Sequence, residues 1–265
     1  MNSDCYFSMG KSHMVCEDYA YAGINSNGNQ VAVVSDGCSA SPDTDFGSRF
    51  LVRSAVVCGE NTGYCSRETY AESLIRSIIW CAYQTGSGLH LSRQSLDATI
   101  LYLEVVEEEI RIVTAGDGVI FAVDHENKLE YWDIDYASGA PFYPSYLLDE
   151  KRYLGYIENC GTESTISHFT SESSIALDVE HSGVMGNYMC LPKKSYKFVG
   201  VASDGILTFD MSTEEAIIQL AAYKNTKGEF VKRRMRKFLK QCVKNNTSPS
   251  DDVSMAVVHL GDENE

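Results

Sequence analysis

The chain has 265 residues, of which 44% are hydrophobic and 22% charged, the composition of a globular protein with enough apolar material for a sizeable core. A formal net charge of −15 argues against a nucleic acid or an anionic membrane as partner, because a negative surface repels phosphate at long range. The nine cysteines include no C-x-x-C pair, and no apolar run approaches the ~20 residues that span a bilayer. We expect one domain, residues 1–265, in a reducing cytoplasm.

The first third of the chain predicts a β-hairpin followed by two helices. Residues 19–24 and 30–35 are apolar segments separated by the turn sequence NSNGN, which is typical of a hairpin. Apolar residues at helical spacing predict the two helices within 43–58 and 67–83.

The middle of the chain predicts further strands. The segments ATILYLEVV, EIRIVTAG and VIFAVD, between residues 98 and 124, are rich in β-branched residues and predict an antiparallel meander. Residues 128–197 are mixed, with the strand-like SSIALDVE and the aromatic loop APFYPSYLLD.

The last quarter predicts two helices and a strand. STEEAIIQLAAY begins with a capping box from Ser212 to Glu215. KRRMRKFLK, residues 232–240, has apolar residues at helical spacing, which favours an amphipathic helix with a solvated basic face over a nucleic-acid site. VSMAVVHL predicts the last strand. Because strands and helices do not alternate, the predicted fold class is α+β, a sandwich of antiparallel sheets covered by helices.

One short pattern occurs twice, as VAVVSDG at 31–37 and as VGVASDG at 199–205. In each copy an apolar strand leads to an aspartate, and a glycine then lets the backbone turn sharply. Other carboxylates also stand where predicted strands begin or end, namely Glu17, Asp18, Asp117, Asp251 and Asp252. Since strand ends from distant parts of a sandwich can meet at one edge, we expect an acidic edge.

Clustered carboxylates repel one another, so they must be protonated or neutralised by metal. Oxygen ligands without His or Cys select Mg²⁺ or Mn²⁺, and two such ions form a known centre for phosphate-ester hydrolysis. Any one of these residues alone would more often be a turn residue. Their repeated placement beside apolar strands favours a metal site.

Six segments resemble, in order and spacing, the motifs of the metal-dependent protein phosphatases of the protein phosphatase 2C family. They are CEDYAYAG, VAVVSDGCSAS, SLDATIL, VTAGDGVIFAV, VGVASDGIL and DDVSMAVV. The resemblance implies a four-layer α-β-β-α sandwich, two antiparallel sheets flanked by helices, with a two-metal centre at one edge. It also implies a mobile flap within 128–197, as in many microbial members.

The resemblance implies metal roles for particular residues. Asp18 and Asp36 match metal ligands, with Asp36 bridging both ions, and Gly37 matches a residue that binds through its carbonyl. Asp204 and Asp251 match the residues that complete the shell of one ion. All of these roles are expectations that follow from the family likeness.

Two further matches and two departures concern the surroundings of this site. Glu17 matches an acidic residue that reaches the metal through water, and Asp117 matches one tied to a third, more weakly held ion. Cys38 stands where animal members have a histidine proposed as general acid. Because no His-Asp partner for Cys38 occurs at a suggestive spacing, a packed thiol is favoured over a nucleophile. The usual phosphate-binding arginine is absent, so Lys11 and His13 are the nearby cations available for that role.

The leading hypothesis is a Mg²⁺- or Mn²⁺-dependent phosphatase that hydrolyses phosphoserine or phosphothreonine in proteins. A water activated between two ions would attack phosphorus, with no covalent phosphoenzyme. The alternative is a catalytically degenerate, phosphatase-like binding or regulatory module, which the changed turn Cys38-Ser39-Ala40 favours. A receiver-like or haloacid-dehalogenase-like enzyme is disfavoured because those folds alternate strands and helices.

Overall fold

The computed structural model of the chain describes residues 1–59, 67–181 and 183–261. The strands in these ranges are β1 (Asn2–Ser8), β2 (Tyr19–Ile24), β3 (Gln30–Ser35), β4 (Ile100–Val106), β5 (Glu109–Ala115), β6 (Gly118–Asp124), β7 (Leu129–Asp135), β8 (Glu163–Phe169), β9 (Ser174–Glu180), β10 (Asn187–Pro192), β11 (Tyr196–Ala202) and β12 (Val253–His259). The α-helices are α1 (Thr44–Gly59), α2 (Arg67–Gly88), α3 (Glu150–Cys160), α4 (Thr213–Ala221) and α5 (Phe230–Asn245).

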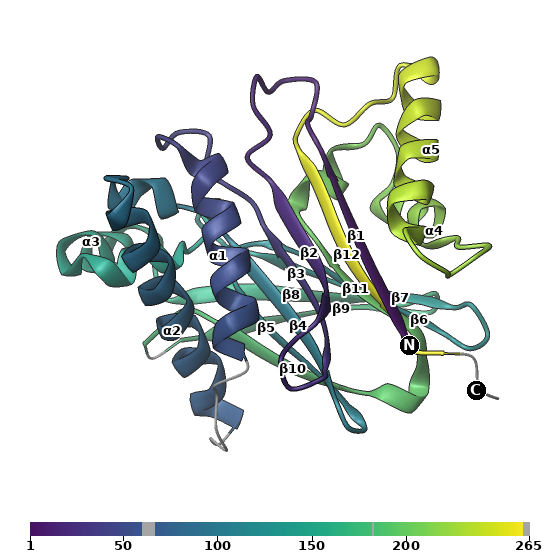
Figure 1. The fold of residues 1–265 in the computed structure, drawn as a ribbon, viewed down its shortest axis with the longest axis horizontal. Helices are drawn as coiled ribbons and strands as arrows, with labels where there is room; N and C mark the ends of the chain where they lie inside the picture. The colour runs from purple at the N-terminus through teal and green to yellow at the C-terminus, as the bar shows by residue number, and fades with distance from the viewer. Residues whose placement is uncertain (60–66, 182, 262–265) are drawn as a thin grey trace.

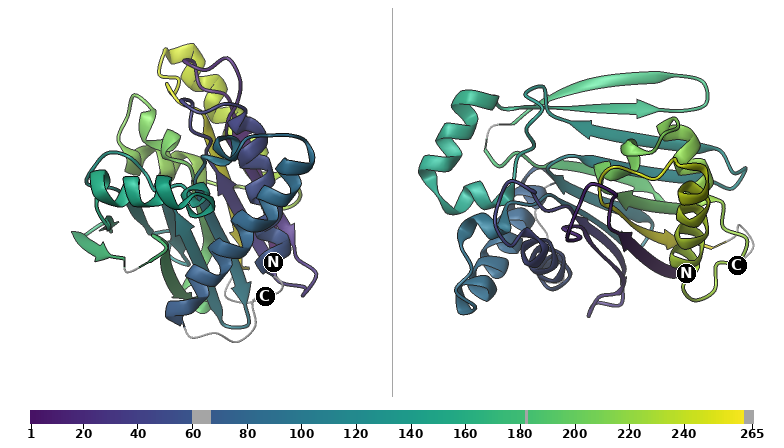
Figure 2. Two further views of the ribbon diagram at one scale, coloured as in Figure 1. Left: turned by 90° about the vertical axis from the view of Figure 1, so that its left-hand side faces the viewer. Right: turned by 90° about the horizontal axis from the view of Figure 1, so that it is seen from above.

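The described strands form two antiparallel sheets. One sheet has seven strands in the order β1-β12-β11-β6-β7-β8-β9, and the other has five in the order β10-β5-β4-β3-β2. The hairpin of β8 and β9 forms the outer edge of the larger sheet, beyond β7 (Figure 2). The predicted α+β class with two antiparallel sheets is therefore confirmed.

The central strands are apolar at successive positions because both of their faces are buried. On β3, Val31 and Val33 pack against α1 and α2, whereas Ala32 and Val34 pack between the two sheets. The same alternation on β12 directs Met255 toward the core beneath α4 and α5. Three buried apolar layers result, one between the sheets and one between each sheet and the helices that cover it. The fold therefore has two sheets enclosed by two layers of helices (Figure 1). The four-layer arrangement implied by the family resemblance is present.

The predicted three-strand meander is wrong in one respect. β4 pairs with β5, but β6 pairs with β7 and β11 in the other sheet. The chain crosses between the sheets at Gly116 and Gly118, whose φ values of 92° and 138° are readily adopted only by glycine. Asp117 lies between these two glycines, at one end of the sandwich.

Most other predicted elements are confirmed. β2 and β3 have the predicted bounds, α2 continues to Gly88, and Ser212 caps α4 by accepting a hydrogen bond from the Glu215 amide at 3.2 Å. β1, β7, β8, β10 and α3 were not predicted, and four of these lie within the mixed stretch 128–197. Among the described helices, none combines the length and the apolar character needed to cross a bilayer.

Candidate metal centre

The four aspartates expected as principal ligands lie at strand ends. Asp18 directly precedes β2 and Asp36 directly follows β3, in the five-stranded sheet. Asp204 begins the short 3₁₀ helix η4 (Asp204–Thr208) after β11, and Asp251 lies two residues before β12, in the seven-stranded sheet. The candidate site therefore lies at one end of the sandwich, where strands of both sheets begin or end.

Asp36 is the central member of this group. Besides burial, the nearby carboxyl groups of both Asp18 and Asp204 raise the pKa of Asp36. Asp18 is also held from the other sheet, because Ser203 Oγ donates to Asp18 Oδ2 at 2.6 Å and accepts from the Ser254 amide at 2.9 Å. Three carboxyl groups from distant parts of the chain thus lie close together.

Burial and mutual repulsion shift the acidity of these groups. Burial raises the pKa of Asp18 to about 7. Burial, together with the charges on Asp18 and Asp204, holds the pKa of Asp36 well above its usual range. Burial and then the charge on Asp251 raise the pKa of Asp204, which places Asp251 next to the same group. At neutral pH these carboxyl groups need either protons or cations close to them.

The donor atoms of this group fit a hard divalent cation. In the described part of the chain, no three His, Cys, Asp or Glu side chains are arranged so that they could hold a metal ion as they stand. However, Asp18 Oδ1 and Asp204 Oδ1 are buried without a hydrogen-bond partner, and the four expected ligand side chains all present carboxylate oxygens. Buried anionic oxygens without partners are costly, and Mg²⁺ or Mn²⁺ would satisfy them.

Asp117, the residue expected beside a third ion, also faces this group. Burial and then the charge on Asp204 raise the pKa of Asp117 to about 7. Asp133 and Asp135 on β7 extend the acidic edge, and burial followed by the charge on Asp135 raises the pKa of Asp133 to about 6. Sequence reasoning missed these two residues, although their spacing of two places both side chains on one face of a strand.

The glycines of the two Ser-Asp-Gly segments serve close packing. Neither has a positive φ, so the expectation that these glycines allow a sharp backbone turn is wrong. A Cβ on Gly37 would lie 2.9 Å from Thr44 Cβ, and one on Gly205 would lie 1.7 Å from the backbone oxygen of Asp252. Each glycine lets another segment approach the aspartate that precedes it.

Asp252 fixes the loop that leads to Asp18. Its buried carboxylate accepts hydrogen bonds from the backbone amides of Gly10 and Glu17, both at 2.7 Å. His13 bridges the same region, with Nδ1 3.2 Å from Asp252 Oδ2 and Nε2 3.1 Å from Asp251 Oδ1. Burial lowers the pKa of His13, but the charges on Asp252, Asp251 and Glu17 raise it by more. A cationic imidazole is therefore favoured beside an expected ligand.

The remaining expected residues lie at the rim. Glu17 Oε1 accepts a hydrogen bond from Thr44 Oγ1 at 2.8 Å. Lys11 is exposed, and its backbone amide donates to the carbonyl of Pro249 at 3.2 Å. A pocket of about 260 Å³ adjoins this rim and is lined by Ser12, His13, Met14, Val15, Glu17 and Ser39.

A buried ion pair holds the turn that carries Cys38, and sequence reasoning missed it. Asp97 accepts hydrogen bonds from Ser41 Oγ at 2.7 Å and from Ser145 Oγ at 2.5 Å. One guanidinium nitrogen of Arg152, on α3, donates to both Asp97 oxygens at 2.8 and 3.0 Å. The Cys38 amide donates to the Asp97 carbonyl at 2.8 Å. The turn beside Asp36 is therefore tied to α3, within the expected flap region.

Replacement of Arg152 by Met is expected to destabilise the protein by about 3 kcal/mol, because it leaves the buried Asp97 carboxylate without its cation. Urea unfolding followed by circular dichroism measures the change. Lys151→Met is the matched control, since the neighbouring Lys151 side chain is exposed. Equal stability of the two variants would contradict a stabilising role for the ion pair.

Comparisons with known proteins agree with this architecture. A family model described as protein phosphatase 2C matches residues 8–240. No curated protein matches the chain. Among solved structures, a bacterial serine phosphatase has a TM-score of 0.62 at 14% identity, covering 99% of this chain and 98% of that one.

Two further solved structures have the same fold. Serine/threonine phosphatase Stp1 from Staphylococcus aureus has a TM-score of 0.61 at 15% identity, covering 98% of this chain and 94% of its own. Serine-threonine phosphatase 2C from Toxoplasma gondii has a TM-score of 0.56 at 12% identity, covering 96% and 93%. At such identities the likeness shows a shared fold, whereas chemistry must be argued from the residues themselves.

Proposed function

The chain belongs to the protein phosphatase 2C family, and from this premise we propose that it is a Mg²⁺- or Mn²⁺-dependent phosphatase acting on phosphoserine or phosphothreonine in proteins. The observation that carries the proposal is that Asp36 lies near both Asp18 and Asp204, whose charges add to burial in raising its pKa. Carboxyl groups this close form a natural site for divalent cations, and hydrolysis of phosphate esters is a reaction that such cations support.

Asp18, Asp36, Asp204 and Asp251 would hold two ions, with Asp36 serving both and the Gly37 carbonyl adding one ligand. When bound, such ions lower the pKa of a water molecule and partly neutralise the negative charge of the phosphate. The protein orients the ligands beforehand. Ser203 donates to Asp18 Oδ2, so Asp18 Oδ1 is the oxygen left available.

The acidic residues around this group have supporting roles in the proposal. Glu17 would reach an ion through water, and Asp117 would serve a third, more weakly held ion. Asp252 holds the backbone of Glu17 in place through a hydrogen bond of 2.7 Å, and thereby positions the adjacent Asp18. Asp252 is thus a positioning residue.

Lys11 and His13 are the proposed cations for the substrate phosphate. His13 lies between Asp251 and Asp252, whose charges favour its protonated form. Lys11 presents an exposed ammonium group in the same loop. A phosphate that reaches the acidic edge needs such cations to offset repulsion from the carboxylates.

Three wider expectations also belong to the proposal. Residues 1–265 would form a single domain, and the flap would lie within 128–197, around α3 and the 3₁₀ helix η2 (Pro144–Leu148). A cytoplasmic location is supported by the eight cysteines of the described ranges, all of which are free thiols. The substrate would be a phosphoprotein, without nucleic acid or membrane as partner.

Metal removal tests this function. Hydrolysis of p-nitrophenyl phosphate is expected to fall at least ~100-fold in EDTA and to recover in millimolar Mn²⁺ or Mg²⁺, because water and phosphate would lose their electrostatic activation. Hydrolysis that survives thorough chelation would contradict the proposal. Calorimetric binding of Mn²⁺ without any turnover would instead favour the degenerate binding module.

A further inference from the structure

Helix α5 has a charge opposite to that of the rest of the molecule. Its 16 residues include seven Lys and Arg and no Asp or Glu. The whole chain has 22 basic and 37 acidic residues, so removing the seven leaves 15 basic against 37 acidic residues outside α5. Positive charge is therefore concentrated on one helix of an otherwise acidic protein.

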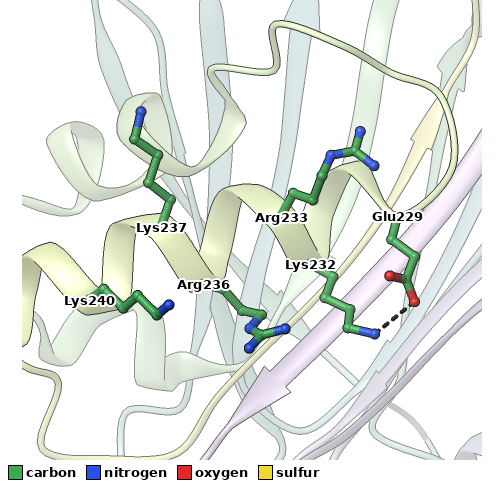
Figure 3. A pocket seen from close by; sticks show the side chains of 6 residues that line it. All are labelled: Glu229, Lys232, Arg233, Arg236, Lys237 and Lys240. Atoms are coloured by element: carbon green, nitrogen blue, oxygen red, sulfur yellow. Dashed lines mark hydrogen bonds and ion pairs between the residues drawn. The ribbon is translucent and has the colours of Figure 1, made fainter.

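The two faces of α5 are sharply different. Val231, Met235 and Phe238 are buried in the core beneath the helix, together with residues of α4 and the seven-stranded sheet. The opposite face forms a shallow pocket of about 440 Å³ (Figure 3), lined by Glu229, Lys232, Arg233, Arg236, Lys237 and Lys240. Each of these residues lies three or four positions from another member of the set, so they share one side of the helix. We call this set the basic face.

Part of the basic face has no internal counter-charge. Lys232 Nζ donates to Glu229 at 2.7 Å. The side chains of Arg236, Lys237 and Lys240 are exposed and form no hydrogen bond or ion pair with any residue that the structure describes. Like charges four residues apart, such as Lys232 and Arg236, repel each other on a helix, and a bound anion would relieve that repulsion.

The geometry suits a short segment of extended chain. From Lys232 to Lys240 the helix rises about 12 Å, which is the length of about four residues in an extended peptide. A duplex nucleic acid or an anionic membrane is a far larger negative surface and would also meet the acidic remainder of the molecule. An acidic peptide segment can contact α5 alone.

The helix is also connected to the candidate site. α5 ends at Asn245, and the chain reaches the expected ligand Asp251 six residues later. In Figure 1 this end of α5 and the start of β12 lie at the same end of the molecule. A protein held at the basic face would therefore have its neighbouring segments close to the acidic edge.

We propose that the basic face of α5 binds an acidic, extended segment of the phosphoprotein substrate, separate from the phosphorylated residue. This inference rests on the proposed phosphatase function. Binding at α5 would raise the local concentration of the phosphorylated residue at the acidic edge without taking part in the chemistry. Electrostatic attraction would also speed the encounter of the two proteins.

A charge-reversal variant tests the basic face directly. In Arg236→Glu/Lys237→Glu/Lys240→Glu, binding of a fluorescent, unphosphorylated hexaglutamate peptide is expected to weaken at least ~10-fold at low salt. Fluorescence polarisation measures it, and the measurement needs no catalysis. The neutral variant Arg236→Gln/Lys237→Gln/Lys240→Gln is expected to show a smaller loss in the same direction, and it serves if charge reversal impairs folding.

The matched control is Arg76→Glu/Lys128→Glu/Lys194→Glu, which changes the net charge equally at exposed cations outside α5. It is expected to bind the peptide within ~2-fold of the unmodified protein, because short-range contacts at α5 are intact. Equal losses in the control and the α5 variants would overturn the proposal. So would tighter binding of single-stranded DNA or of phosphatidylserine vesicles than of the acidic peptide.

Kinetics then identify the bound segment as part of a substrate. Charge reversal at α5 is expected to raise KM for a phosphopeptide with an acidic tail and to leave hydrolysis of p-nitrophenyl phosphate unchanged. An unchanged KM for the tailed peptide would overturn the substrate assignment. If the unmodified protein, the α5 variants and the control variant all fail to hydrolyse p-nitrophenyl phosphate, the result counts against the phosphatase function. Peptide binding tests the basic face independently of that result.

Discussion

Replacement of Asp36 by Asn is expected to lower kcat/KM for p-nitrophenyl phosphate by at least ~10³-fold. Asp36 is the residue whose carboxyl group lies near both Asp18 and Asp204, where strands of the two sheets end. Asparagine has nearly the same shape but removes the negative charge and one anionic oxygen. The loss therefore reports on cation binding and positioning rather than on packing.

The matched control for this variant is Asp210→Asn, at an exposed aspartate that follows η4. It is expected to retain full activity, because Asp210 is outside the proposed ligand set. Circular dichroism and calorimetric titration with Mn²⁺ separate the causes. A folded Asp36→Asn protein with weakened Mn²⁺ binding supports the assignment, whereas activity within ~10-fold of the unmodified protein would contradict it.

The stability of the metal-free protein is expected to fall as pH rises from about 4 to 8. The folded-state pKa of Asp18 is about 7, raised by burial from the usual 3.8. A carboxyl group with a raised pKa stabilises the fold fully below its unfolded pKa, and that contribution is lost as pH rises through the folded pKa. The difference between a pKa of 3.8 and one of about 7 corresponds to roughly 4 kcal/mol for this one group, lost between those two pH values. Asp36, Asp117 and Asp204 act in the same direction.

Bound cations should oppose this loss, since they stabilise the charged carboxylates of the folded state. Mn²⁺ at about 100 times its Kd would add about 2.7 kcal/mol to the free energy of unfolding. Urea unfolding at several pH values, in EDTA and in Mn²⁺, measures both effects. Asp36→Asn is expected to reduce the pH dependence in EDTA. A metal-free stability that is constant or rising between pH 5 and 8 would contradict the argument.

The sequence predicted those elements whose signals are local. The bounds of β2 and β3 follow from a strand pattern closed by turn residues, and the start of α4 follows from the Ser212 cap. β7, β8 and β10 lie in a stretch of mixed composition, where local propensity competes with tertiary packing. The meander error has the same origin, because nothing local reveals that β6 leaves the sheet of β4 and β5.

The sequence by itself determined where carboxylates stand relative to strands, because the end of an apolar run and a following Asp-Gly are properties of adjacent residues. Only the tertiary structure decided which carboxylates lie together, since the closeness of Asp36 to Asp18 and Asp204 depends on how two separate sheets pack. The same holds for Arg152 and Asp97, which are 55 positions apart and form a contact only when α3 folds back toward the Cys38 turn. It also holds for Gly37 and Gly205. A side chain at either position would collide with atoms that are distant in the sequence, whereas the φ of these glycines would be open to other residues.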